Sequence, residues 1–171
     1  MLGRVRNILP FDVLIMLYYT LIYPYLIYCI IVWGGACTTN LNRLQILQNR
    51  AVRLVTRSPF RSSSAPIFAH LNLLQVSDIR RLQIALFLFR CKHFLLPNIC
   101  LQHCLVNTRL AHDTRHCSTF VMQPFRTNIR GQYVSVIGPK TWETLPVNLR
   151  DIKSVFVFKR EVVKYFVSNY V

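Results

Sequence analysis

The sequence of 171 residues predicts a mainly α-helical fold, with a bundle-like N-terminal part, a loop-rich middle and a C-terminal helix. Two observations favour this class. Apolar residues recur at three- and four-residue spacings in several stretches, which is the period of an amphipathic helix. Hydrophobic residues make up 53% of the chain and charged residues only 16%, so a substantial buried core is expected rather than disorder.

The first predicted element lies in residues 13–42, a stretch without a charged residue. Its apolar part, residues 13–33, is long enough to cross a bilayer, so a membrane helix is one interpretation. Pro24 stands in the middle, however, and five tyrosines crowd the centre instead of the ends. We therefore expect a buried helix that bends at Pro24 and ends at Gly34-Gly35. We also expect the tyrosines in the core rather than on a base-stacking surface: Tyr18, Tyr19, Tyr23, Tyr25 and Tyr28.

A second helix is predicted over residues 41–57, with Thr39 or Asn40 as its N-cap. Helical spacing places one apolar set on a single face: Leu41, Leu44, Leu47, Ala51, Leu54 and Val55. A basic stripe falls away from that face: Arg43, Arg50, Arg53 and Arg57. Such a stripe is either a solvated surface or a set of phosphate contacts. Because no acid lies between Asp12 and Asp78, the second interpretation gains weight.

The remaining elements follow in order. A short helix is expected over residues 66–74, and a longer one begins with Ser77 as its cap and stops before Pro97. Residues 98–131 are expected to be irregular, residues 132–137 to form at most one short strand, and Ser154 to cap a last helix that reaches about Ser168. The predicted regions are thus 1–97 (helical), 98–150 (loop-rich) and 151–171 (C-terminal helix).

The charge of the chain is its most unusual property. Lys and Arg number 21 against six Asp and Glu, and 16 of the basic residues are Arg, which binds phosphate in a bidentate manner. We expect a polyanionic partner, either nucleic acid or an anionic membrane surface. The acids are isolated in sequence, and the chain has neither a glycine-rich phosphate loop nor a Gly-x-Ser-x-Gly motif. No catalytic centre is therefore indicated.

One cluster of residues has the spacing of a metal site. A zinc knuckle could use Cys-x3-Cys-x7-His-x4-Cys, formed by Cys100, Cys104, His112 and Cys117. The alternative is that Cys100 and Cys104 are small core residues one helical turn apart. We expect no cofactor apart from this open alternative. We expect reduced cysteines and an intracellular protein, nuclear or cytoplasmic, with membrane association as the alternative.

An ordered series of segments resembles the region just downstream of the polymerase palm in non-LTR (LINE-type) retrotransposon reverse transcriptases. The series covers nearly the whole chain. Its members are residues 6–10, 17–29 with Trp33-Gly34, 44–54, 77–83, 95–97, Thr114-Arg115, Arg126-Thr127, 138–146 and Phe158-Lys159.

This resemblance implies the thumb and post-thumb part of an RNA-directed DNA polymerase. The catalytic aspartates of that family lie upstream of this region and have no counterpart here, so we expect no polymerase activity from the chain by itself. The resemblance bears on the zinc hypothesis in two ways. Some LINE-type elements end in a Cys-Cys-His-Cys knuckle with similar spacing, but in the relatives that this chain most resembles the positions of Cys100 and Cys104 are aromatic core positions, which weakens the hypothesis. The resemblance implies two partners, a template–primer duplex and the upstream palm.

Three hypotheses for function follow. The first is a reverse transcriptase fragment that binds the backbone of an RNA–DNA or DNA duplex without base specificity. Its contacts would be Arg43, Arg50, Arg53 and Arg57, with Arg80 and Arg81 as weaker candidates. The second is a small membrane-associated protein anchored by residues 13–33. The third is a translated remnant with no selected function.

Overall fold

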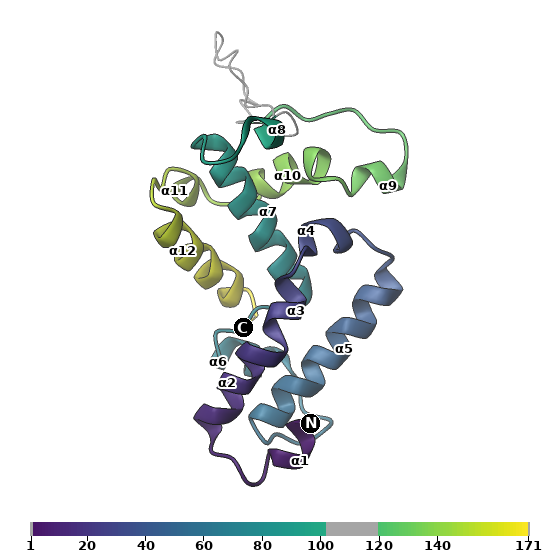
Figure 1. Cartoon of the computed structure of the whole chain (residues 1–171), viewed down its shortest axis with the longest axis vertical. Coiled ribbons are helices and arrows are strands. Elements are labelled where there is room, and N and C mark those ends of the chain that lie inside the picture. The colour runs from purple at the N-terminus through teal and green to yellow at the C-terminus, as the bar shows by residue number, and fades with distance from the viewer. Residues whose placement is uncertain (1, 102–119, 171) are drawn as a thin grey trace. The chain divides into compact units, whose positions relative to one another are not determined.

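The computed structural model describes residues 2–101 and 120–170, and these residues are mainly helical, as predicted (Figure 1). No strand occurs among the described residues. The chain forms two compact units, the first made of Met1–Arg80 with Val163–Val171, and the second of Arg81–Val162. Two helices, α7 (Val76–Lys92) and α12 (Val155–Ser168), contribute residues to both units. The predicted boundary near residue 98 lies inside the second unit.

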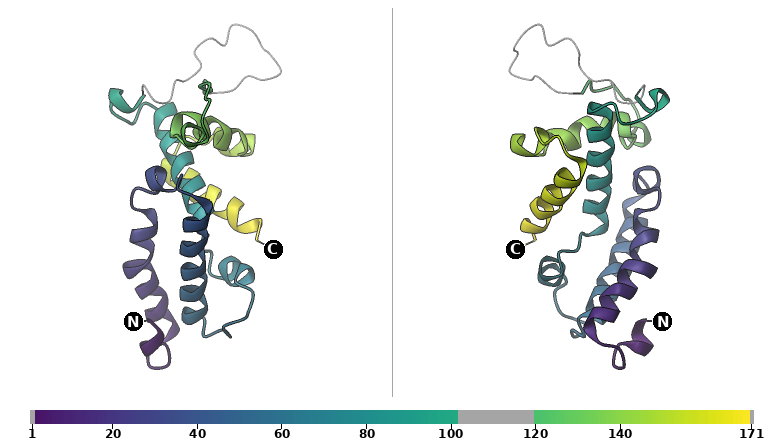
Figure 2. Two further views of the ribbon diagram at one scale, coloured as in Figure 1. Left: turned by 90° about the vertical axis from the view of Figure 1, so that its right-hand side faces the viewer. Right: turned by 60° about the vertical axis from the view of Figure 1, so that its left-hand side comes forward.

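The core of the first unit lies where α2 packs against α5, and the two helices run side by side in both views of Figure 2. Leu14 and Tyr18 of α2 are fully buried there against Val52 of α5 and Phe68 of α6. The helices of this unit are α1 (Leu2–Val5), α2 (Phe11–Leu21), α3 (Tyr23–Ile27), α4 (Ile30–Trp33), α5 (Thr38–Val55) and α6 (Ala65–His70), with the first turns of α7 and the last of α12.

The apolar part of the uncharged run, residues 13–33, forms three helices instead of one bent helix. The chain breaks first at Ile22, and Pro24 lies in the first turn of α3, where its missing N–H would have had no helical partner. It breaks again at Cys29, which has a left-handed φ of 50°. The indole Nε1 of Trp33 donates to the Tyr28 carbonyl oxygen (2.6 Å) and holds this second turn. Among the described residues, every helix is too short or too polar to cross a membrane.

The expected burial of the tyrosines is wrong for three of the five, and Tyr19 is 44% exposed. Tyr18 is fully buried, but Tyr25 and Tyr28 are 80% and 76% exposed. Tyr19 and Tyr25 lie on helix sides that face away from the core, and Tyr28 lies in the turn between α3 and α4.

The buried face of α5 is rotated relative to the predicted one. Leu47 was expected in the core but is 60% exposed, whereas Gln48 is buried. The Gln48 amide is tolerated there because its Nε2 donates to the Tyr18 hydroxyl (3.0 Å) and to the Leu74 carbonyl oxygen (2.8 Å). Burial of the Tyr18 hydroxyl in this interface raises its pKa to about 12. Gln48, with its hydrogen bonds made, therefore occupies the interface between α2 and α5 in which Leu47 was expected.

The second unit is built around stacked aromatic side chains. Phe158 of α12 packs against Phe89 of α7, with ring centroids 4.5 Å apart, and against Trp142, 5.7 Å away. Phe120 meets the Trp142 ring edge-on at 5.5 Å. Besides parts of α7 and α12, the described helices of this unit are α8 (Asn98–Leu101), α9 (Asn128–Gly131), α10 (Val134–Glu143) and α11 (Val147–Arg150).

The short strand that was possible over residues 132–137 does not form, because α10 begins at Val134 and continues through Gly138 and Pro139. The helix buries Val136, Pro139 and Trp142, which follow one another at three-residue spacing. The glycine also permits close packing, since a Cβ at this position would lie 3.3 Å from the Leu88 side chain of α7. The region expected to be loop-rich therefore contains a ten-residue helix.

The helix starts were predicted with mixed success. The last helix begins at Val155, directly after Ser154, as expected. By contrast, α5 begins at Thr38, so that Thr39 and Asn40 lie inside it, and no side chain caps its N-terminus. Likewise α7 begins at Val76, one residue before Ser77.

Candidate nucleic-acid interface

The solvent-facing side of α5 carries Arg43 and Arg50, both exposed and about two turns apart. Neither side chain makes a hydrogen bond or ion pair with the part of the chain that the structure describes. Ile46 and Leu47 lie between them and are 64% and 60% exposed. Two exposed guanidinium groups with a full set of donors can bind phosphate, and the aliphatic side chains can contact sugars.

The other half of the predicted stripe is bound within the protein. The Arg53 Nε donates to the Ser62 carbonyl oxygen (2.9 Å), which fixes the loop after α5. Arg57 donates from Nε to the Arg6 carbonyl oxygen (3.0 Å) and from Nη2 to that of Leu9 (2.7 Å). These contacts tie the end of α5 to the turn between α1 and α2. Arg53 and Arg57 thus stabilise the loops around the C-terminal end of α5 through hydrogen bonds to backbone oxygens.

The two weaker candidates differ from each other. Arg81 is exposed, whereas Arg80 is half-buried, and its burial lowers the pKa of the guanidinium. The Arg80 stem packs on Gly34, where a Cβ would come within 2.8 Å of Arg80 Cδ and would overlap the Ile30 carbonyl oxygen. Arg80 is therefore poorly placed to reach a large polyanion, because part of its side chain is covered.

Charge in the first unit is strongly one-sided, with nine Arg and Lys residues against Asp12 and Asp78. Asp78 is buried and accepts a hydrogen bond from the Tyr170 hydroxyl (2.5 Å). Sequence reasoning overlooked Arg4 and Arg61, which are exposed in this unit. Neither falls in a periodic pattern, so only their contribution to the net charge could have suggested them.

Only one of the four predicted zinc ligands lies in the part of the chain that the structure describes. Cys100 lies in α8 and is half-buried, whereas Cys104, His112 and Cys117 lie outside the described residues. Within the described part of the chain, no three metal-ligating side chains lie together.

Comparison with known proteins relates part of the chain to a transposon-encoded RNA-directed DNA polymerase. Over 55 residues it is 40% identical to the "Probable RNA-directed DNA polymerase from transposon BS" of Drosophila melanogaster. The match covers 32% of this chain and 6% of that relative, so the chain corresponds to a small part of the relative's length. No protein-family model matches the chain. No solved structure matches it either.

Proposed function

We propose that the chain is a thumb-like part of a transposon reverse transcriptase and that α5 binds the phosphate backbone of a template–primer duplex. The observation that carries this proposal is the exposed pair Arg43 and Arg50, which have no partner in the described residues. Their separation along the helix axis, about 10 Å, corresponds to about three base-pair steps. Both can therefore contact one strand of a duplex.

The similarity to an RNA-directed DNA polymerase supports an RNA–DNA hybrid as the ligand, because copying RNA into DNA produces that duplex. The excess of basic residues in the first unit supports contact with a polyanion. The aliphatic Ile46 and Leu47 between the arginines offer no hydrogen bonds to base edges. Binding without base specificity follows, as the sequence also predicts.

Fluorescence anisotropy of the purified full chain tests this proposal. The ligands are an RNA–DNA hybrid, each single strand, and heparin of matched charge. The proposal predicts tighter binding to the hybrid than to heparin at every salt concentration, because a duplex presents phosphates at the spacing of the arginines. Equal affinity for hybrid and heparin would reduce the interaction to general basicity and would contradict the proposal.

A further inference from the structure

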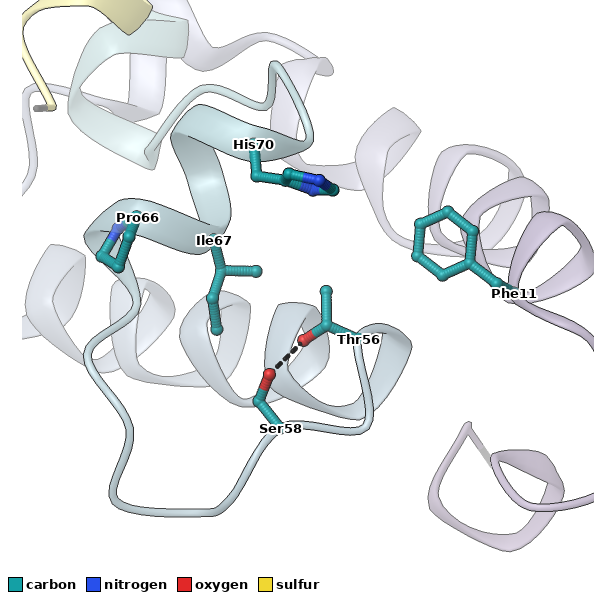
Figure 3. Close-up of a pocket in the computed structure, with 6 residues that line it drawn as sticks. All are labelled: Phe11, Thr56, Ser58, Pro66, Ile67 and His70. Carbon is teal, nitrogen blue, oxygen red and sulfur yellow. Dashed lines mark hydrogen bonds between the residues drawn. The ribbon is translucent and has the colours of Figure 1, made fainter.

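The first unit contains a cavity of about 360 Å3 beside the C-terminal end of α5 (Figure 3). Small-molecule sites commonly have volumes of about 300–1,000 Å3, so a single planar ring system fits within it. The residues that line it are Phe11 of α2, Thr56 and Ser58 after α5, and Pro66, Ile67 and His70 of α6.

The walls of the cavity are apolar and its mouth is open. Figure 3 shows the ring of Phe11 across the cavity from Ile67. Phe11 is 43% exposed, and Pro66 and His70 are exposed too, so a ligand can enter from solvent. An exposed aromatic ring opposite an aliphatic side chain suits a flat heterocycle, because bases stack on aromatic faces irrespective of their sequence.

Polar groups lie at one side of the cavity. The hydroxyls of Thr56 and Ser58 share a hydrogen bond of 2.8 Å, and Thr56 also donates to the Val52 carbonyl oxygen (3.1 Å). Either hydroxyl can donate the shared bond, and in both cases the Ser58 oxygen keeps a free lone pair. The Ser58 oxygen retains acceptor capacity, which an N–H group on the edge of a nucleobase can use.

Positive charge lies next to the cavity. Arg57 stands between Thr56 and Ser58, and its guanidinium binds the Leu9 carbonyl oxygen, two residues before Phe11. Asp12 is the only acid among residues 1–77. A nucleotide combines a flat ring for the cavity with a phosphate for the arginine, whereas an acyl chain or apolar side chain would leave the charge unused.

We propose that this cavity binds an unpaired nucleobase at the end of the duplex held by α5. The inference rests on the proposed function, because the phosphates on Arg43 and Arg50 bring the strand to the cavity. From Arg50 to Thr56 the helix advances by about 9 Å and turns by about 240°, so the strand curves around the C-terminal end of α5 to reach the cavity. The site thus favours a duplex with a single-stranded overhang over a blunt one.

The test compares three labelled RNA–DNA hybrids: one blunt, one with a 2-aminopurine overhang, and one with an abasic overhang of equal charge. The full chain should bind the 2-aminopurine overhang at least about fivefold more tightly than the abasic one, with quenching of the base fluorescence on stacking. Phe11→Ala should abolish both effects. Phe60→Ala is the matched control, since Phe60 is 76% exposed and outside the cavity, and it should retain both.

Equal affinity for the base-bearing and abasic overhangs in the unmodified chain would overturn the inference, and this comparison requires no variant to fold. Retention of the preference in both Phe11→Ala and His70→Ala would also overturn it. Displacement of 2-aminopurine by a fatty acid, without any base preference in affinity, would assign the cavity to an acyl chain instead. Binding of the blunt hybrid tests phosphate binding by α5 alone. If the blunt hybrid binds but the base preference is absent, only the cavity proposal fails; if the blunt hybrid does not bind, the proposed function fails.

Discussion

At the scale of single residues, Arg43 and Arg57 carry the same side chain in different roles. The Arg57 guanidinium holds two backbone oxygens that lie 48 and 51 residues away in sequence, whereas Arg43 is exposed on α5. Arg57→Ala should lower the free energy of unfolding by about 1 kcal/mol, because solvent can replace only part of these exposed bonds. Arg43→Ala should change it by less than about 0.5 kcal/mol. Urea denaturation followed by circular dichroism measures both, and equal effects would contradict the division of roles.

Tyr18 makes the stability of the first unit depend on alkaline pH. Burial raises its pKa in the folded state to about 12, above the ordinary value of 10.0, so folding favours the protonated phenol. This contribution is complete below pH 10 and is lost as the pH rises through 12, with a slope of up to about 1.4 kcal/mol per unit. The free energy of unfolding of the unmodified chain should therefore fall more steeply from pH 10 to 12 than that of Tyr18→Phe. Parallel curves would show that Tyr18 does not titrate differently on folding.

At the scale of helices, α12 offers a direct test of the aromatic core. Phe158 is fully buried against Phe89 and Trp142, and Phe156 of the same helix is 75% exposed. Phe158→Ala should destabilise the protein by about 3–5 kcal/mol because it leaves a cavity between rings. Phe156→Ala should cost less than about 1 kcal/mol. Thermal or urea unfolding of the two variants checks this, and similar losses would contradict the assignment of the core.

Helical periodicity was sufficient to predict the existence of α5, α7 and α12, because their apolar residues repeat over many turns. It failed where tertiary contacts decide the outcome. Leu47 is exposed because Gln48 finds partners on α2 and at Leu74, which sequence spacing cannot reveal. The helix over Val134–Glu143 was missed because Gly138-Pro139 is typical of a chain break, yet packing on Leu88 uses the glycine.

The candidate site was likewise predicted in part. The seven-residue spacing identified the arginines of α5, and Arg43 and Arg50 lie on its exposed side. The bonds of Arg53 and Arg57 to backbone oxygens could not be anticipated, because their acceptors belong to loops whose position depends on the folded unit. The cavity beside them is formed by residues from three separate stretches of chain, so no local motif marks it.

At the scale of the whole molecule, both units carry a net positive charge, with nine basic and two acidic residues in the first and twelve basic and four acidic residues in the second. In the first unit the end of the chain is bonded to the start of α7. Tyr170 accepts a hydrogen bond from the Gln75 N–H (3.0 Å) and donates one to Asp78. This unit carries the exposed arginines of α5 and the cavity. The second is organised around its aromatic rings. Net charge does not distinguish the units, so the proposed contact with a polyanion rests on the exposed Arg43 and Arg50 of α5.

The salt dependence of hybrid binding tests the central claim most directly. Each phosphate contact contributes about 0.9 to the slope of log K against log salt concentration. The double variant Arg43→Gln with Arg50→Gln should therefore lower the magnitude of that slope by about two, with unchanged helicity and free energy of unfolding. A matched double variant, Arg126→Gln with Arg130→Gln, alters two exposed arginines of the second unit and should leave the slope unchanged. An unaltered slope in the α5 variant would contradict phosphate binding by this helix.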